Sequence, residues 1–253
     1  MPHVNVRGTD LYFESQGNGE PLVLLHNGLG CTKSFTRQIL DFSKHHRVVA
    51  YDRHGYGRSS HLIALKRGWL DESVDELICL LDEINIDRTD LCGICAGGAV
   101  ALLCAAQNPS RVNRVVVAGT CCFGEEDTLS RALKLYPHPD HLSNEWVREL
   151  SEHHGATYGK DLYGIFYQAI KEENGYPFKE YDLRPTLHQV RNPVLVIYGD
   201  RDNIFQLEQA LTMYRHLRKA ELCIIPDCGH RPNEEKPQDF NRETLDFFQR
   251  HES

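Results

Sequence analysis

The sequence predicts an α/β fold, in which a doubly wound and mostly parallel sheet carries helices on both faces. Two observations carry this prediction. Short runs of apolar and β-branched residues alternate along the chain with segments of helical periodicity. Within these runs the apolar content is continuous, which is typical of parallel strands covered on both faces. Right-handed crossovers are expected to connect the strands.

A hairpin and a series of buried strands are expected to form the sheet. Residues 3–15 (HVNVRGTDLYFES) alternate in polarity around Gly8, which predicts two antiparallel strands joined by a tight turn. The buried strands are expected at 21–26 (PLVLLH), 46–52 (HRVVAYD), 88–94 (RTDLCGI), 112–119 (VNRVVVAG), 193–199 (PVLVIYG) and 220–226 (AELCIIP).

Two helices are predicted with particular clarity. Apolar residues three and four positions apart predict a helix over 70–84 that packs one stripe on the sheet. Residues 97–106 are apolar on all sides, which predicts a helix buried in the middle of the structure. The stripe of the first helix consists of Leu70, Val74, Leu77, Ile78, Leu81 and Ile84.

Residues 121–185 interrupt the alternation of strands and helices. They offer no clear strand, contain helical patches such as 161–170, and hold 10 of the 23 aromatic residues. We interpret them as a small helical cap, inserted into a core of residues 1–120 and 186–253. The cap is expected over the carboxyl edge of the sheet, where ligands bind in open α/β folds. An ordinary long crossover, whose aromatic residues only pack, is the alternative.

Composition restricts the partners of the protein. With 253 residues, of which 41% are hydrophobic and 25% charged, the chain is suited to one large ordered domain. A net charge of −8 disfavours nucleic acid and anionic membranes as partners. No run of about 18 apolar residues occurs, and the N-terminus lacks an apolar signal core. We therefore expect a cytoplasmic protein, monomeric or homodimeric, that acts on a small molecule.

No metal, cofactor or disulfide framework is expected. The nine cysteines are odd in number and irregular in spacing, so they should be free thiols in a reducing compartment. Adjacent pairs of histidines or cysteines lack the spacing of a metal site. Gly28-Leu29-Gly30, followed by Asp52, imitates a dinucleotide fingerprint, but Lys33 occupies the position of its third glycine.

The stretch Gly93-Ile94-Cys95-Ala96-Gly97 places a thiol on a sharp turn between a strand and a helix. Glycines two residues to either side remove steric conflict around such a turn. The adjacent helix N-terminus carries a partial positive charge, which favours a thiolate. Cys95 is therefore predicted to be a nucleophile.

Two alternatives for Cys95 stay open. Cys92 and Cys95 form a C-x-x-C at a strand–helix junction, the setting of thioredoxin-like redox pairs. Against this, Cys92 falls inside the strand, and the chain is much longer than that fold. In the other alternative the cysteine stands in place of a catalytic serine, and the scaffold only binds its ligand.

His230 and Asp202 are predicted to complete the site. His230 follows Cys228-Gly229 in a late loop that should precede the last helix, and it is the candidate general base. Asp202 lies just past a predicted strand in YGDRD, where a carboxylate can orient the imidazole and stabilise its cation. Asp200, two residues earlier, is the competing carboxylate.

Five motifs resemble those of the α/β-hydrolase superfamily, and together they cover nearly the whole chain. They follow one another in the order that the family shows, with nucleophile, acid and histidine in sequence. The motifs are PLVLLHNGLG (21–30), VVAYDRHGYGRSS (48–60), GICAGG (93–98), VIYGDRD (196–202) and PDCGHRPNEEKPQDF (226–240).

The resemblance implies a triad of Cys95, His230 and Asp202. It favours Asp202 over Asp200, because the earlier carboxylate usually caps or braces this turn in similar sequences. Most members have serine at the elbow, so Cys95 departs from the common esterase pattern. Dienelactone hydrolases and polyester synthases are similar to this chain in using a G-x-C-x-G elbow.

The resemblance also implies an oxyanion hole made of two backbone amides. One belongs to Ala96, immediately after the nucleophile. The other comes from the loop at 26–30, which is similar to that of enol-lactonases; Leu29 is the better match, and Asn27 is the other candidate.

These residues predict a hydrolase that cleaves an ester, lactone or thioester through an acyl-thioester on Cys95. The same acyl-enzyme also suits an acyltransferase, because amines, thiols and alcohols attack thioesters readily. A carbon–carbon bond hydrolase or lyase, and a small-molecule receptor without turnover, are further alternatives on this scaffold. The sequence does not assign the residues that contact the substrate.

Overall fold

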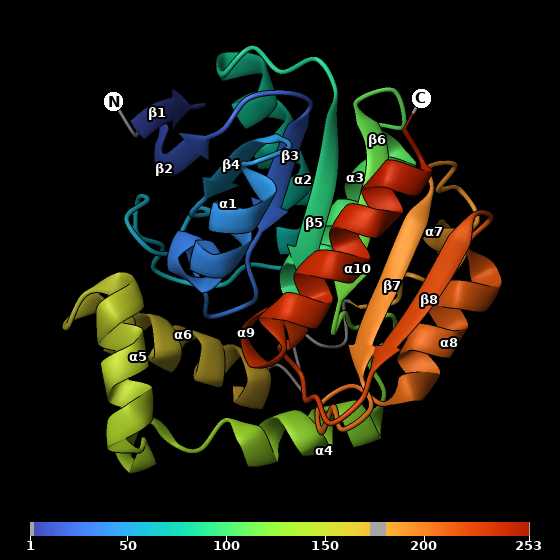
Figure 1. Ribbon diagram of the computed structural model, residues 1–253. Helices are drawn as coiled ribbons and strands as arrows, with labels where there is room; N and C mark the ends of the chain where they lie inside the picture. The colour runs from blue at the N-terminus through green and yellow to red at the C-terminus, as the bar shows by residue number, and fades with distance from the viewer. Residues whose placement is uncertain (1–2, 173–180, 253) are drawn as a thin grey trace.

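The computed structural model describes residues 3–172 and 181–252, and it has the predicted α/β architecture (Figure 1). Within this part of the chain one eight-stranded sheet forms, in the order β1-β2-β4-β3-β5-β6-β7-β8. β2 is antiparallel to both of its neighbours, and every other adjacent pair is parallel. The strands are β1 (His3–Val6), β2 (Thr9–Gln16), β3 (Pro21–Leu25), β4 (Arg47–Tyr51), β5 (Thr89–Ile94), β6 (Val112–Ala118), β7 (Val194–Gly199) and β8 (Ala220–Ile225).

The strand predictions are confirmed with one correction. Arg7 and Gly8, with φ of 49° and 88°, form the tight turn of the β1–β2 hairpin, and a positive φ at both positions matches the twist of paired strands. Each later strand begins and ends within one residue of its predicted bounds. β8 is not buried as expected, because it is the last strand of the sheet; its Ile224 is 37% exposed.

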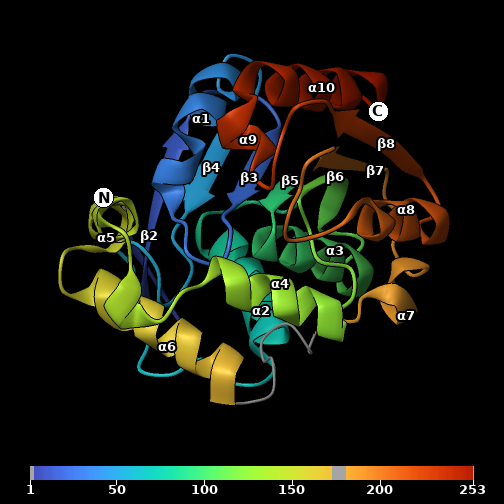
Figure 2. The same cartoon turned by 90° about the horizontal axis from the view of Figure 1, so that it is seen from below.

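Helices cover both faces of the sheet, as Figure 2 shows. α1 and α10 lie on one face, and α2, α3 and α8 lie on the other. The helices are α1 (Thr36–Phe42), α2 (Trp69–Glu83), α3 (Ala96–Gln107), α4 (Glu126–Leu135), α5 (Asn144–His154), α6 (Tyr158–Glu172), α7 (Arg184–Leu187), α8 (Leu207–His216), α9 (Pro232–Glu235) and α10 (Pro237–Arg250), with short 3₁₀ turns η1 (Thr32–Phe35) and η2 (Pro139–His141).

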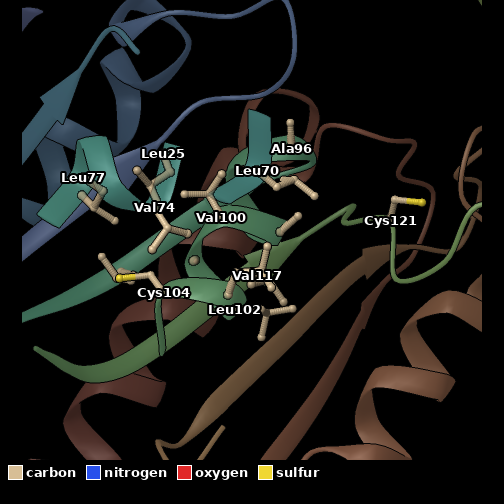
Figure 3. Packing of buried hydrophobic residues seen from close by; sticks show 14 of the residues in the cluster. Leu25, Leu70, Val74, Leu77, Ala96, Val100, Leu102, Cys104, Val117 and Cys121 are labelled. Carbon is tan, nitrogen blue, oxygen red and sulfur yellow. The ribbon is translucent and has the colours of Figure 1, made fainter. Parts of the chain in front are cut away.

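Alternating side chains of the strands divide the core into two layers. In β3, Leu22 and Leu24 belong to the cluster under α1 and α10, whereas Val23 and Leu25 belong to the cluster under α2 and α3. Figure 3 shows the second layer, where side chains of α2 and of the strands pack around the buried helix α3. Ala96 to Ala105 of α3 are all buried, as the all-apolar pattern predicts. This packing fixes the N-terminus of α3 at the carboxyl end of β5.

The helices α4, α5 and α6 lie beyond the carboxyl ends of the strands (Figure 1). The two ends of this segment meet in a narrow neck, where Phe123 and Asp182 form an isolated bridge. The amide of Gly124 donates to the carbonyl of Tyr181 at 2.6 Å, close beside it. We therefore propose that residues 121–185 form one inserted cap over the carboxyl edge of the sheet.

Candidate active site

Cys95 occupies a strained turn between β5 and α3. Its φ of 51° and ψ of −113° lie outside the common regions for a residue with a side chain, a conformation that costs about 1–3 kcal/mol and needs strong support from its surroundings. The amide of Cys95 donates to the carbonyl of Ala118 at 2.8 Å. A Cβ on Gly93 would collide with the backbone of Gly97, and one on Gly97 would collide with the carbonyl of Leu25. The glycines therefore permit the turn that presents the thiol.

His230 and Asp202 form a buried pair beside this turn. Nδ1 of His230 lies 2.9 Å from Oδ2 of Asp202, and the two side chains are 12% and 1% exposed. The other carboxylate oxygen of Asp202 accepts the amides of Ile204 and Phe205, both at 2.9 Å. These bonds fix the carboxylate, which in turn orients the imidazole so that Nε2 is left for the thiol.

Asp200 has a different role in the same turn. Its carboxylate accepts the amide of Cys228 at 3.2 Å, and its side chain is otherwise exposed. It braces the loop that precedes His230 and has no contact with the imidazole. The structure thus brings Asp202, and not Asp200, to the histidine.

The electrostatic state of His230 depends on both of its neighbours. Burial by itself lowers the pKa of the imidazole. The charge of the Cys95 thiolate and the hydrogen bond to Asp202 outweigh burial and raise the pKa of His230 to about 10. A negative charge at Cys95 and the Asp202 carboxylate therefore both favour the protonated form of His230.

A cavity with about 440 Å³ of empty space, part of it open to solvent, lies above Cys95 and His230. Its walls come from the core and from the cap. Among the described residues that line it there is no lysine, arginine, aspartate or glutamate. Aromatic side chains dominate the lining, namely Tyr56, Trp69, Tyr136, Phe166, Tyr181 and Phe205. The sequence indicated the aromatic cap but gave no signal for Tyr56 and Trp69, which lie outside it.

Two residues of the predicted oxyanion region border the cavity. Ala96 lines it beside Cys95, and Gly28 lines it from the loop after β3 that also holds the candidates Leu29 and Asn27. Leu29 is 7% exposed and packs its side chain in the core. Within the described chain, the amides of Gly28 and Leu29 both lack a hydrogen-bond acceptor, so the lining of the cavity favours Gly28.

His154 of the cap anchors the loops around the site. Its Nδ1 accepts the amide of Gly57 at 2.8 Å, and its Nε2 donates to the carbonyl of Leu29 at 3.0 Å. Burial lowers the pKa of His154 to about 4, which keeps the ring neutral and able to make both bonds. On the same helix, Glu149 pairs with Arg231 at 2.7 Å. α5 therefore holds the oxyanion loop, the 53–60 loop and the histidine loop together.

The environment of Cys92 differs from that of Cys95. Cys92 is completely buried under α1 and α10, and burial raises the pKa of its thiol. Such a thiol is a poor partner for thiol–disulfide exchange. Among the described residues, no cluster of His, Cys, Asp or Glu has the composition of a metal site, and no helix is long and apolar enough to cross a membrane.

The geometry predicts a large difference between the two aspartates. In Asp202→Asn, the remaining oxygen can still accept the amides of Ile204 and Phe205, but the new amide group faces Nδ1 of His230 and favours the wrong tautomer. We expect kcat to fall by roughly 10²- to 10⁴-fold with little change in KM. Asp200→Asn is expected to stay within about threefold of the parent. Steady-state kinetics on an activated ester measures both, and the opposite ranking would assign the role to Asp200.

Comparison with known proteins agrees with this architecture. The chain is similar to 3-oxoadipate enol-lactonase 2 of Acinetobacter baylyi, with 28% identity over 87% of this chain and 86% of the relative. It is 24% identical to a 2-hydroxy-6-oxo-6-phenylhexa-2,4-dienoate hydrolase of Comamonas testosteroni, over 94% of this chain and 91% of that one. The solved structure of the enol-lactonase from Burkholderia xenovorans superposes with a TM-score of 0.79 at 22% identity, covering 98% and 100% of the two chains.

A match to a family model assigns the chain to a protein family. The model described as "Alpha/beta hydrolase family" matches residues 22–243, which include strands β3 to β8, helices α4 to α6 and the histidine loop. The match includes the elbow at Cys95 and the loops of Asp202 and His230. The chain therefore belongs to the alpha/beta hydrolase family.

Proposed function

We propose that the protein hydrolyses a carboxylic ester, lactone or thioester through an acyl-thioester on Cys95. The observation that carries this proposal is the position of the Cys95 elbow at the base of the aromatic-lined cavity, beside the His230–Asp202 pair. A nucleophile, a base and an orienting acid in hydrogen-bonding order are the parts that acyl transfer requires.

The proposed reaction begins with the thiolate–imidazolium pair. The Cys95 thiolate attacks the substrate carbonyl, and the amides of Ala96 and Gly28 stabilise the resulting oxyanion. The imidazolium of His230 then gives its proton to the leaving group as the acyl-thioester forms. Neutral His230 next takes a proton from water, the hydroxide adds to the thioester, and the thiolate leaves as the carboxylic acid is released. The pair returns to its starting charges.

The cavity favours a neutral acyl group. The names of two relatives, an oxoadipate enol-lactonase and a hexadienoate hydrolase, denote substrates that carry a carboxylate. Recognition of a buried carboxylate requires a paired cation or several directed donors. The described lining of this cavity has neither lysine nor arginine, and its side-chain donors apart from Cys95 and His230 are the uncharged groups of Tyr56, Trp69, Tyr136 and Tyr181. We therefore expect the protein to hydrolyse neutral acyl groups faster than acyl groups with a free carboxylate.

The acyl-enzyme can be tested directly by mass. Incubation with p-nitrophenyl butyrate and rapid acid quenching should add one butyryl group, which maps to the peptide of Cys95 and is removed by hydroxylamine. Cys79 and Cys223 are the other described thiols with partial exposure, so Cys79→Ser and Cys223→Ser are matched controls that should keep the adduct. An adduct confined to either control position, with Cys95 free, would overturn the proposal.

The same experiment separates hydrolysis from acyl transfer. Adding a small thiol or amine should leave the product mainly as butyric acid if water is the natural acceptor. Predominant transfer to the added acceptor, at concentrations far below that of water, would instead favour an acyltransferase.

A further inference from the structure

An apolar groove lies on the surface next to the cavity. It runs between the loop at 61–66 and helix α6 of the cap, and has about 730 Å³ of empty space that is largely open to solvent. One lining residue, Gln168, is polar, and the others are Ile63, Ala64, Leu65, Gly164, Ile165 and Ala169. Ile63 is 92% exposed, which is unusual for a large aliphatic side chain beside other apolar surface. We call this feature the acyl groove.

The acyl groove adjoins the catalytic cavity. Leu65 lines both of them, so the groove and the cavity border the same side chain. Helix α6 also contributes to both, because Phe166 faces the cavity and its neighbour Ile165 faces the groove. A chain that leaves the cavity past Leu65 therefore enters the groove directly.

A second depression beside the loop at 61–66 is charged in part rather than apolar. It borders the cavity at Tyr56, Leu65 and Trp69 and also reaches Ile63 and Ala64. Its lining, however, includes charged side chains such as Arg7, Lys66, Glu72 and Asp75. An aliphatic chain gains nothing by displacing water from such charges. Of the two depressions beside Leu65, the groove along α6 is the one that suits an aliphatic chain.

We propose that the acyl groove holds the distal part of an extended, neutral acyl chain whose carbonyl lies at Cys95. This inference rests on the proposed function and narrows its substrate class to esters or thioesters of medium- to long-chain acids. The aromatic cavity would enclose the carbonyl end, and the groove would bury the tail against Ile63 and α6. Each methylene buried in this half-open groove should raise kcat/KM by about two- to fourfold.

Gly164 offers a way to fill the groove without disturbing the fold. A Cβ at this position would meet nothing within 4 Å, and replacing glycine within a helix favours helix formation. In Gly164→Phe the ring should occupy the groove. We expect kcat/KM for dodecanoyl thioesters and esters to fall by about tenfold or more, while the values for acetyl and butyryl substrates stay within about twofold.

Two kinds of control distinguish occupation of the groove from a general loss of stability or activity. Gly164→Ala adds only a methyl group and should keep the chain-length profile, and Gln249→Phe adds the same ring at an exposed position of α10. Ile63→Asp should repeat the selective loss of long substrates, because it places a charge in the path of the tail.

The isomeric esters ethyl octanoate and octyl acetate identify which part of the substrate the groove holds. Gly164→Phe should reduce hydrolysis of ethyl octanoate more than hydrolysis of octyl acetate.

A larger reduction for octyl acetate would place the leaving group in the groove and overturn the acyl assignment. Unchanged chain-length profiles in Gly164→Phe and Ile63→Asp, with short esters still hydrolysed, would overturn the groove but keep the proposed function. Absence of hydrolysis and of an adduct on Cys95 with every ester would overturn both.

Discussion

Cys95→Ala is expected to abolish turnover of every substrate while the protein stays folded. Without the thiol no acyl-enzyme can form, and the residual rate depends only on the amides of the oxyanion hole and on binding. We expect kcat to fall by roughly 10⁴- to 10⁶-fold. Alanine removes a half-buried sulfur at a turn whose geometry depends on Gly93 and Gly97, so thermal unfolding should change little. Retention of substantial turnover in Cys95→Ala would exclude Cys95 as the nucleophile.

Cys95→Ser is the more informative companion variant, because a serine nucleophile needs His230 in its neutral form. The thiolate contributes to the raised pKa of His230, so its loss should lower that pKa from about 10. A serine needs neutral imidazole to become nucleophilic, whereas in the proposed mechanism Cys95 reacts as a thiolate beside imidazolium. Between about pH 6 and pH 9, kcat/KM of the serine variant should therefore rise with pH. For the parent enzyme, kcat/KM should instead stay nearly constant until the imidazolium loses its proton near pH 10. If parent and serine variant gave the same pH profile, Cys95 and His230 would not start as thiolate and imidazolium.

The strands and the elbow could be predicted because local chemistry specifies them. Continuous β-branched runs identify buried strands wherever they occur, and the elbow needs glycine at Gly93 and Gly97 for steric reasons that involve few other residues. The edge strand β8 was predicted to be buried, because its apolar sequence does not reveal that no strand covers its outer side.

The oxyanion loop and the cavity depend on longer-range geometry. Sequence order does not show which residue of a turn borders a cavity, so the sequence did not single out Gly28, which lines the site. Similarly, aromatic enrichment indicates a cap without showing which face of each helix looks inward. The contact of His154 with Leu29 joins residues 125 positions apart. It exists only because the cap docks α5 against the oxyanion loop.

His230→Ala should separate the two halves of the proposed reaction. An activated ester with p-nitrophenolate as leaving group needs no proton from His230, so acylation of Cys95 should persist at a reduced rate. Deacylation depends on His230 as the base that activates water. We therefore expect kcat to fall by roughly 10³- to 10⁵-fold and the butyryl-enzyme to accumulate to nearly one per protein. Intact-protein mass spectrometry during turnover measures this accumulation.

The role of the imidazole in this variant can be distinguished from a structural one by rescue. His230 lies at the cavity wall, so alanine leaves a space in which free imidazole can bind beside Asp202. Added imidazole should hasten release of the butyryl group from His230→Ala, and the effect should grow with pH as neutral imidazole increases. The exposed His188 gives a matched control, because His188→Ala should neither accumulate the adduct nor respond to imidazole. Release of the butyryl group from His230→Ala at the parental rate, without imidazole, would show that another group activates the water.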